Sequence, residues 1–193
     1  MQQKTHSTTS LNRGPDHKHS LENSRLIQIA RNFEATPDRV WAALTEERLV
    51  AQWWGPSPFT CPVSEIDFRI GGKFFNAMES PDGIRTYSTG IFENIVDQEL
   101  IVYSDHFANE IGQVISPNEA GMSGEWTDDL YVTLELAPMN DSRTTQLMLS
   151  HQGIPTEQHD ACIEGWNGCL DKLQKLVERK TESFEEIREE KRH

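Results

Sequence analysis

Two histidines near the end of the chain, His151 and His159, are the side chains best suited to acid–base chemistry. His151 ends an alternating segment in which Leu147 and Leu149 share its face, and His159 opens a helical pattern. If both rings face one cavity, they could polarise a carbonyl group or act as a general base. A structural role is commoner for a buried histidine. We therefore assign no catalytic residue and leave the enzyme class open, with a non-enzyme favoured.

Other sequence signals of catalysis or cofactor binding are absent. The chain has no GxSxG, P-loop, HExxH, CxxC or dinucleotide fingerprint, so we expect no metal and no cofactor. Cys61, Cys162 and Cys169 are too few and too scattered for a disulfide framework or a zinc site. His17 and His19 lack a third fixed ligand. Cys162 and Cys169 fall two helical turns apart, about 10 Å, so we interpret them as small apolar side chains rather than a disulfide.

Aromatic residues point to a different kind of site, an apolar pocket. Tryptophan provides a rigid apolar wall with a single polar N–H, and the chain has five of them. Packing in the core explains any one of these side chains equally well. Combined with the histidines and helix cysteines, the aromatic residues give a candidate ligand-binding set: Trp54, Phe75, Phe92, Trp126, His151, His159, Cys162, Trp166 and Cys169.

The net charge of −13 excludes several classes of partner. Residues 1–24 carry +1 and residues 181–193 carry −2, which leaves −12 on residues 25–180. Nucleic acids and anionic membranes require clustered Lys and Arg, so we expect neither as a partner. An acidic docking face for a basic partner stays open beside simple solubility. No apolar run is long enough to span a membrane and no secretory signal is visible, which predicts a cytoplasmic protein.

The elements that must position these residues follow from periodicity. An alternating strand begins at Arg25, and helices over about 37–44 and up to Trp54 follow it, the second stopped by Gly55 and Pro56. Turn residues then separate a series of further strands. These strands are expected at about 61–69, 73–79, 84–95, 99–104, 129–137 and 144–151.

A long amphipathic helix is predicted from Thr156, its N-cap, because apolar residues recur at spacings of three and four up to Val177. About two dozen residues would reach on the order of 35 Å, enough to cross a sheet. Gly165 and Gly168 weaken this helix, so either a backbone packs closely there, which we favour, or space is left for a ligand. Residues 1–24 are expected to be a mobile tail, and the charged residues 181–193 a fraying one.

The segment from Asp105 to Asp128 is too long and too rich in glycine for a hairpin turn. Loops of this size are often lids or binding loops. Phe107, Met122 and Trp126 are its apolar side chains able to seal a pocket mouth. An ordered surface loop is the alternative.

Several sequence blocks resemble one known family. FEATPDRVWAALTEERLVAQWWGP, CPVSEIDFRIGGKFF, GIPTEQH and EGWNGCLDKL are similar, in this order, to the activator of heat-shock-protein-90 ATPase homologue type within the START-like (SRPBCC) superfamily. The resemblance runs from about 25 to 178. It implies an α+β helix-grip domain over 25–180: a curved antiparallel sheet of about six to seven strands wrapped on a long C-terminal helix, with two short helices after the first strand.

The resemblance also implies a cavity between sheet and helix. Relatives in this superfamily bind lipids, hormones or polyketides, a few are cyclases or hydrolases, and others are co-chaperones. We therefore expect binding or transport of a small apolar or lipid-like molecule. Two alternatives are an interaction module that stimulates a chaperone ATPase and a cyclase-like or hydrolase-like enzyme using the pocket histidines. Assembly as a homodimer is left open.

Overall fold

One antiparallel sheet forms the body of this computed structural model, which describes residues 24–128 and 130–189. Its strands lie in the order β1-β8-β7-β5-β4-β3-β2, and β6 pairs with β4. The strands are β1 (Ser24–Phe33), β2 (Thr60–Ile66), β3 (Lys73–Glu79), β4 (Arg85–Val96), β5 (Leu100–Ser104), β6 (His106–Ala108), β7 (Tyr131–Met139) and β8 (Thr144–Pro155). All of the pairings are antiparallel, as the turn signals predict.

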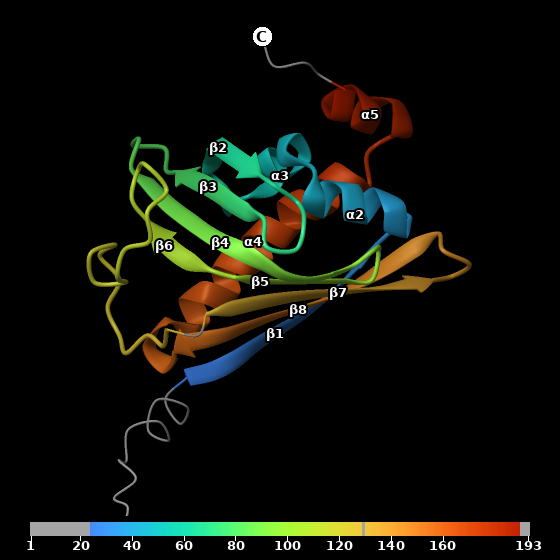
Figure 1. The fold of residues 1–193 in the computed structure, drawn as a ribbon. Helices are drawn as coiled ribbons and strands as arrows, with labels where there is room; N and C mark the ends of the chain where they lie inside the picture. The colour runs from blue at the N-terminus through green and yellow to red at the C-terminus, as the bar shows by residue number, and fades with distance from the viewer. Residues whose placement is uncertain (1–23, 129, 190–193) are drawn as a thin grey trace, which may run out of the picture.

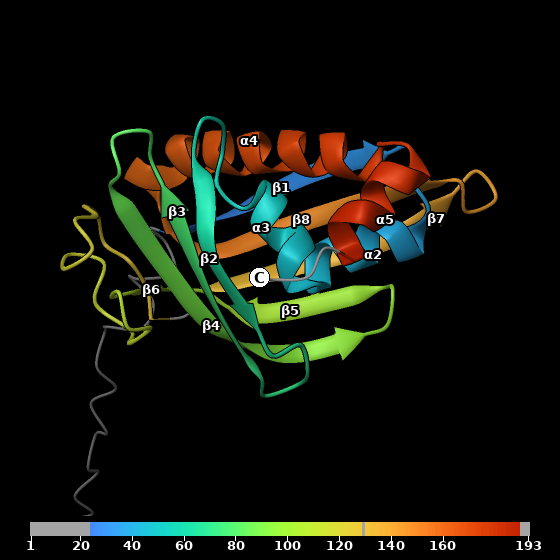
Figure 2. The ribbon, with the colours of Figure 1, turned by 90° about the horizontal axis from the view of Figure 1, so that it is seen from above.

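The helices cover one side of this sheet. They are α2 (Pro37–Thr45), α3 (Glu47–Trp53), the short 3-10 helix η1 (Thr156–Gln158), α4 (His159–Val177) and α5 (Thr181–Glu189). Figures 1 and 2 show the sheet curling so that α4 runs alongside β1 and β8, while α2 and α3 lie within the curl. α4 packs against β1, β8, α2 and α3. The predicted helix-grip arrangement is therefore confirmed.

The apolar stripe of α4 supplies much of the core. Trp166, Cys169, Leu170, Leu173 and Val177 are all buried against the sheet and the shorter helices. Opposite them, alternate residues of the strands point inward, because side chains along a strand alternate between its two faces. The buried strand residues of this core are Phe33, Phe74, Phe92, Ile101, Tyr103, Val132, Leu134, Leu136, Leu147 and Leu149.

The start of α4 and the segment that follows it differ from the sequence prediction. Thr156 begins the 3-10 helix η1, and α4 itself starts at His159 with Gln158 as its N-cap. The predicted fraying tail is wrong for residues 181–189, which form α5. Its Phe184 side chain is only 1% exposed, and the guanidinium of Arg39 lies 4.2 Å from the ring centre. Because most residues of this segment are charged, its one buried apolar residue, Phe184, could not be recognised from the sequence.

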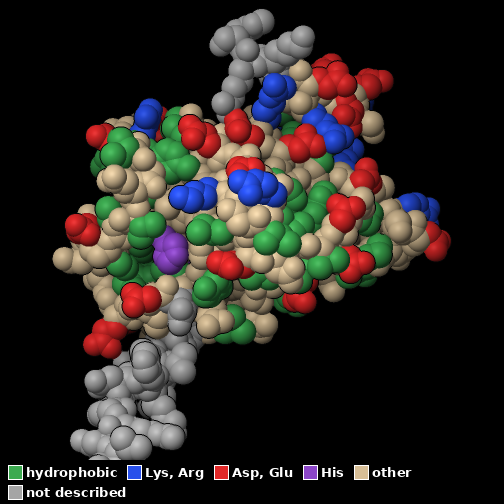
Figure 3. Space-filling model, viewed as in Figure 1, with side chains coloured by type: hydrophobic (Ala, Val, Ile, Leu, Met, Phe, Trp, Pro, Cys, Tyr) green, Lys and Arg blue, Asp and Glu red, His purple; other side chains and the backbone are tan. Residues whose placement is uncertain are grey.

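Charged side chains are dispersed over the visible surface. On the face drawn in Figure 3, acidic and basic groups lie interspersed around the α5 end of the molecule. Within residues 24–128 and 130–189, no helix has the length and apolar character needed to cross a membrane. The predicted mobile tail and its histidines, His17 and His19, fall outside the described residues, as does the end of the chain after Glu189.

Candidate ligand-binding cavity

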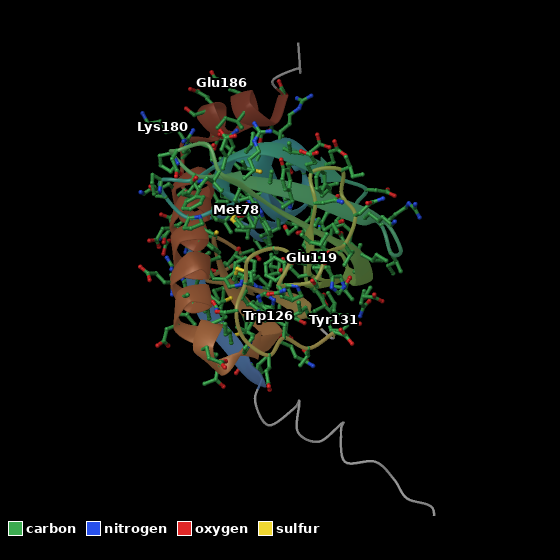
Figure 4. The ribbon with its side chains drawn as sticks, turned by 90° about the vertical axis from the view of Figure 1, so that its left-hand side faces the viewer. Met78, Glu119, Trp126, Tyr131, Lys180 and Glu186 are labelled. Atoms are coloured by element: carbon green, nitrogen blue, oxygen red, sulfur yellow. The ribbon has the colours of Figure 1, made fainter. Side chains whose placement is uncertain are left out.

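A cavity of about 380 Å³ lies between α4 and the sheet. This volume falls in the range of pockets that enclose small organic ligands. Figure 4 shows Met78 of β3 and Trp126 of the loop after β6 beside α4, and both line the cavity. The cavity wall consists of Trp54, Pro56, Phe59, Met78, Thr86, Tyr87, Ser88, Asp105, His106, Phe107, Met122, Trp126, Leu130, His151, Ile154, Gln158, Ala161, Cys162, Gly165, Trp166 and Cys169.

Most of the candidate residues named from the sequence lie in this wall. They come from the end of α3, from β8, from α4 and from the long loop. The candidates that line the cavity are Trp54, Trp126, His151, Cys162, Trp166 and Cys169.

Phe75, Phe92 and His159 lie elsewhere. The register of β3 buries Phe74, so Phe75 occupies the opposite face and stacks on Tyr87 with 5.6 Å between ring centres. Phe92 is buried at another place in the core, beside a second cavity of only about 30 Å³. His159 is half-buried at the start of α4 and is absent from the cavity wall. The prediction that His159 faces the cavity beside His151 is therefore wrong.

The long loop after β6 closes one side of the cavity. Phe107 and Trp126 meet edge to face with 5.2 Å between ring centres, and Met122 also lines the cavity. The side-chain amide of Gln158 donates to the carbonyl oxygen of Ser123 at 3.0 Å and approaches its hydroxyl at 3.1 Å. These bonds attach the loop to η1. The loop is thus part of the cavity wall, as the lid hypothesis requires, rather than a remote surface segment.

The two glycines of α4 have different surroundings. A Cβ atom on Gly168 would lie 2.6 Å from the Cβ of Pro56, so this position needs glycine for close packing. A Cβ atom on Gly165 would meet nothing within 4 Å, and Gly165 lines the cavity. The favoured interpretation, close packing, holds at Gly168. The alternative, open space, describes Gly165.

A polar cluster interrupts the apolar wall. The indole N–H of Trp166 donates to Nδ1 of His151 at 3.0 Å, and the Cys162 Sγ lies 3.8 Å from the same nitrogen. An indole nitrogen can only donate, so Nδ1 accepts and the neutral His151 ring carries its proton on Nε2. Nε2 is 3.8 Å from Oδ2 of Asp105, which is too long for a direct hydrogen bond.

Burial controls the charge of this cluster. The side chains of His151 and Asp105 are 7% and 18% exposed. Desolvation lowers the pKa of His151 to about 4 and raises the pKa of Asp105 to about 7. Both shifts favour the uncharged form, so between about pH 4 and pH 7 the pair is a neutral imidazole beside a carboxylic acid rather than an ion pair.

Asp105 is the site residue that sequence reasoning missed. It directly follows β5, and only its position after a predominantly apolar strand could have drawn attention to it. Strand periodicity does not reveal that Asp105, at the break between β5 and β6, lies in the cavity wall. Met78, Ser88 and Ile154 were missed for a related reason, because their facing depends on the curl of the sheet.

The cysteines are poorly suited to nucleophilic chemistry. Burial raises the pKa of Cys61 to about 11, of Cys162 to about 12 and of Cys169 to about 11. Each therefore stays a thiol at neutral pH, and the thiolate is the reactive form. In the described part of the chain, no group of three or more His, Cys, Asp or Glu side chains is arranged to hold a metal ion.

A curled antiparallel sheet that grips a long C-terminal helix, with a cavity between them, defines the helix-grip class. Residues 34–178 match the model of the family described as Activator of Hsp90 ATPase homolog 1-like protein. The chain belongs to this family, as the resemblance of its sequence blocks implies.

Solved structures extend the comparison. A protein from Chromobacterium violaceum is 28% identical with a TM-score of 0.66, covering 81% of this chain and 99% of its own. A protein from Staphylococcus epidermidis is 26% identical with a TM-score of 0.60, covering 79% and 88%. The AHSA1 protein from Silicibacter pomeroyi, at 19% identity and a TM-score of 0.62 over 78% and 96%, is similar in fold. No curated protein matches the chain.

Proposed function

We propose that this protein binds a small, mainly apolar molecule in the cavity between α4 and the sheet. The observation that carries the proposal is the cavity itself: about 380 Å³ of space with a wall built mostly from aromatic and aliphatic side chains. Small-molecule sites are typically concave, mostly apolar pockets with a few polar groups. An apolar ligand bound here would remove its own surface and that of the wall from water.

The wall is suited to a flat or ring-shaped ligand. Trp54 and Trp166 meet at 90° with 5.9 Å between ring centres, and Phe107 and Trp126 form a second such pair. Rigid rings of this kind contribute large apolar contact areas with little loss of side-chain freedom on binding. Each square ångström of apolar ligand surface removed from water contributes roughly 25 cal/mol.

Catalysis by the pair of His151 and His159 receives no support from the geometry, because His151 lines the cavity and His159 does not. His151 also uses one ring nitrogen as the acceptor for Trp166. Stimulation of a chaperone ATPase stays a prediction from the sequence, and no feature of the described surface favours it over ligand binding.

Native mass spectrometry of freshly purified protein, together with titration of the intrinsic tryptophan fluorescence, tests the proposal. Trp54, Trp126 and Trp166 line the cavity, so a bound aromatic ligand should change the emission. We expect saturable binding of one equivalent. Fluorescence that stays unchanged across a panel of lipids and polyphenols, with no retained mass, would exclude the proposed function.

A further inference from the structure

Four buried side-chain atoms of residues that line the cavity have no hydrogen-bond partner. They are Nε1 of Trp54, Oγ of Ser88, Oδ1 of Asp105 and Nε2 of His151. Trp54 is 8% exposed and His151 6%. An unpaired buried polar group costs roughly 1–3 kcal/mol, and folded proteins leave few of them. Several such atoms in the wall of one cavity indicate that a ligand supplies the missing partners.

The spacing of Asp105 and His151 specifies what that partner can be. The unpaired Nε2 of His151 lies 3.8 Å from Oδ2 of Asp105, the second oxygen of the carboxyl group whose Oδ1 is unpaired. One oxygen atom placed about 2.8 Å from each closes a triangle with an angle of about 85° at that oxygen. The oxygen must accept from the N–H of His151 and can donate its own proton to the carboxyl group of Asp105. A hydroxyl group does both.

The charge of the wall excludes acidic ligands. No lysine or arginine occurs among the described residues of the wall. Lys172 follows the wall residue Cys169 by three positions in α4 but does not itself line the cavity. Its ammonium group donates to the carbonyl oxygens of Gly55 and Phe59. A carboxylate or phosphate placed beside Asp105 would therefore enter an apolar cavity without a counter-charge, which is strongly unfavourable.

We infer that the cavity selects an apolar compound that ends in a hydroxyl group, a phenol or an alcohol, and holds that group between Asp105 and His151. This inference rests on the proposed function and names its ligand class. The rings of Trp54 and Trp166 contact the apolar body of the compound, and the indole N–H of Trp166 fixes the orientation of the His151 ring.

Three matched probes test the inference: 2-naphthol, naphthalene and 2-naphthoate, titrated into the wild-type chain by fluorescence at neutral pH. The hydroxyl group gains hydrogen bonds inside a desolvated site, so 2-naphthol should bind at least about tenfold more tightly than naphthalene. 2-Naphthoate should bind at least about tenfold more weakly than 2-naphthol. These affinity ratios in the wild-type chain show, without any variant, whether the cavity prefers a ligand with a hydroxyl group.

Variants then locate the hydroxyl site. Asp105→Leu should reduce the preference for 2-naphthol over naphthalene to about twofold or less, with naphthalene affinity retained. Asp97→Leu, the same exchange at an exposed position outside the wall, should preserve the preference and serves as the matched control. A preference that survives in Asp105→Leu would overturn the assignment to this pair.

The possible failures are distinguishable. Equal wild-type binding of 2-naphthol and naphthalene would overturn the hydroxyl inference, as when an ordered water already bridges the pair, and would leave the proposed function standing. Tighter binding of 2-naphthoate would overturn the charge argument. Absence of binding for every probe would count against the proposed function itself.

Discussion

The indole N–H of Trp166 donates to Nδ1 of His151 across 3.0 Å, which joins the middle of α4 to β8 within the wall of the cavity. The bond fixes both the orientation of the imidazole and the tautomer with its proton on Nε2. It also turns Nε2 toward Asp105, whose Oδ2 lies 3.8 Å away. The polar end of an otherwise apolar cavity depends on this contact.

His151 should therefore remain neutral at physiological pH. Burial lowers its pKa to about 4, well below the ordinary value of 6.5, so its ring should gain a second proton only in strongly acidic solution. Nitrogen-15 chemical shifts of the ring measure both the tautomer and the titration. A ring that titrates near pH 6.5, or that carries its proton on Nδ1, would contradict the described geometry.

Asp105 should give the folded protein an unusual dependence on pH. Its pKa is about 7 in the folded chain against 3.8 ordinarily, so the folded state binds more protons and stability falls as pH rises between about 4 and 7. His151, with its pKa lowered to about 4, has the opposite effect between about pH 4 and 6.5, where stability rises with pH. In the wild-type chain the two slopes largely cancel.

Asp105→Asn removes the titration of Asp105, so only the opposite effect of His151 should remain. The free energy of unfolding of the variant, relative to that of the wild type, should rise by on the order of 2–4 kcal/mol as the pH increases from about 4 to about 8. Denaturant unfolding measures this difference. Asp97→Asn, the same change at an exposed position, is the matched control for the substitution itself. An Asp105→Asn curve parallel to the wild type would refute the raised pKa.

The two glycines of α4 should respond in opposite directions to alanine. At Gly165 the added Cβ meets nothing within 4 Å, so Gly165→Ala should stabilise the protein by roughly 0.5–1 kcal/mol through helix propensity. At Gly168 the added Cβ meets the Cβ of Pro56 at 2.6 Å, so Gly168→Ala should destabilise it. Thermal unfolding of the pair tests this, and two shifts of the same sign would be inconsistent with the packing described.

Lys172 ties α4 to the turn after α3. Its ammonium group donates to the carbonyl oxygens of Gly55 at 2.9 Å and of Phe59 at 3.1 Å. Lys172→Met removes both bonds and should destabilise the fold by roughly 1–3 kcal/mol. Lys175→Met, at an exposed position of the same helix, should change the free energy of unfolding by less than about 0.5 kcal/mol. Equal effects of the two changes would show that the bonds of Lys172 contribute nothing.

The fold was predictable because its signals are local. The stripe up to Val177, the Gly55-Pro56 stop and the alternation around Val132 each follow from a few neighbouring residues, and each element forms where expected. The short helix α5 could not be predicted, because its one buried residue, Phe184, stands among charged residues. Its burial depends on contacts with α2 and α3, which are distant in sequence.

The site was only partly predictable because it depends on register and curvature. A shift of one residue along a strand exchanges the two faces, and this decides that Phe74 rather than Phe75 points inward. Predictions for residues of α4 are more reliable, because the apolar stripe of a helix shows which of its faces is buried. Cys162, Trp166 and Cys169 all line the cavity, as predicted. Asp105 could not be recognised from the sequence, because its role depends on where the break between β5 and β6 lies relative to α4 and β8.

Filling the cavity tests the central claim most directly. In Gly165→Leu the new side chain should grow into the space that a ligand would occupy, whereas Glu164→Leu adds the same side chain to the exposed side of the helix. Naphthalene or 2-naphthol binding, followed by tryptophan fluorescence, should weaken at least about tenfold in Gly165→Leu and stay within about twofold of the wild type in Glu164→Leu. Affinity unchanged in a folded Gly165→Leu variant would show that the ligand does not bind in this cavity.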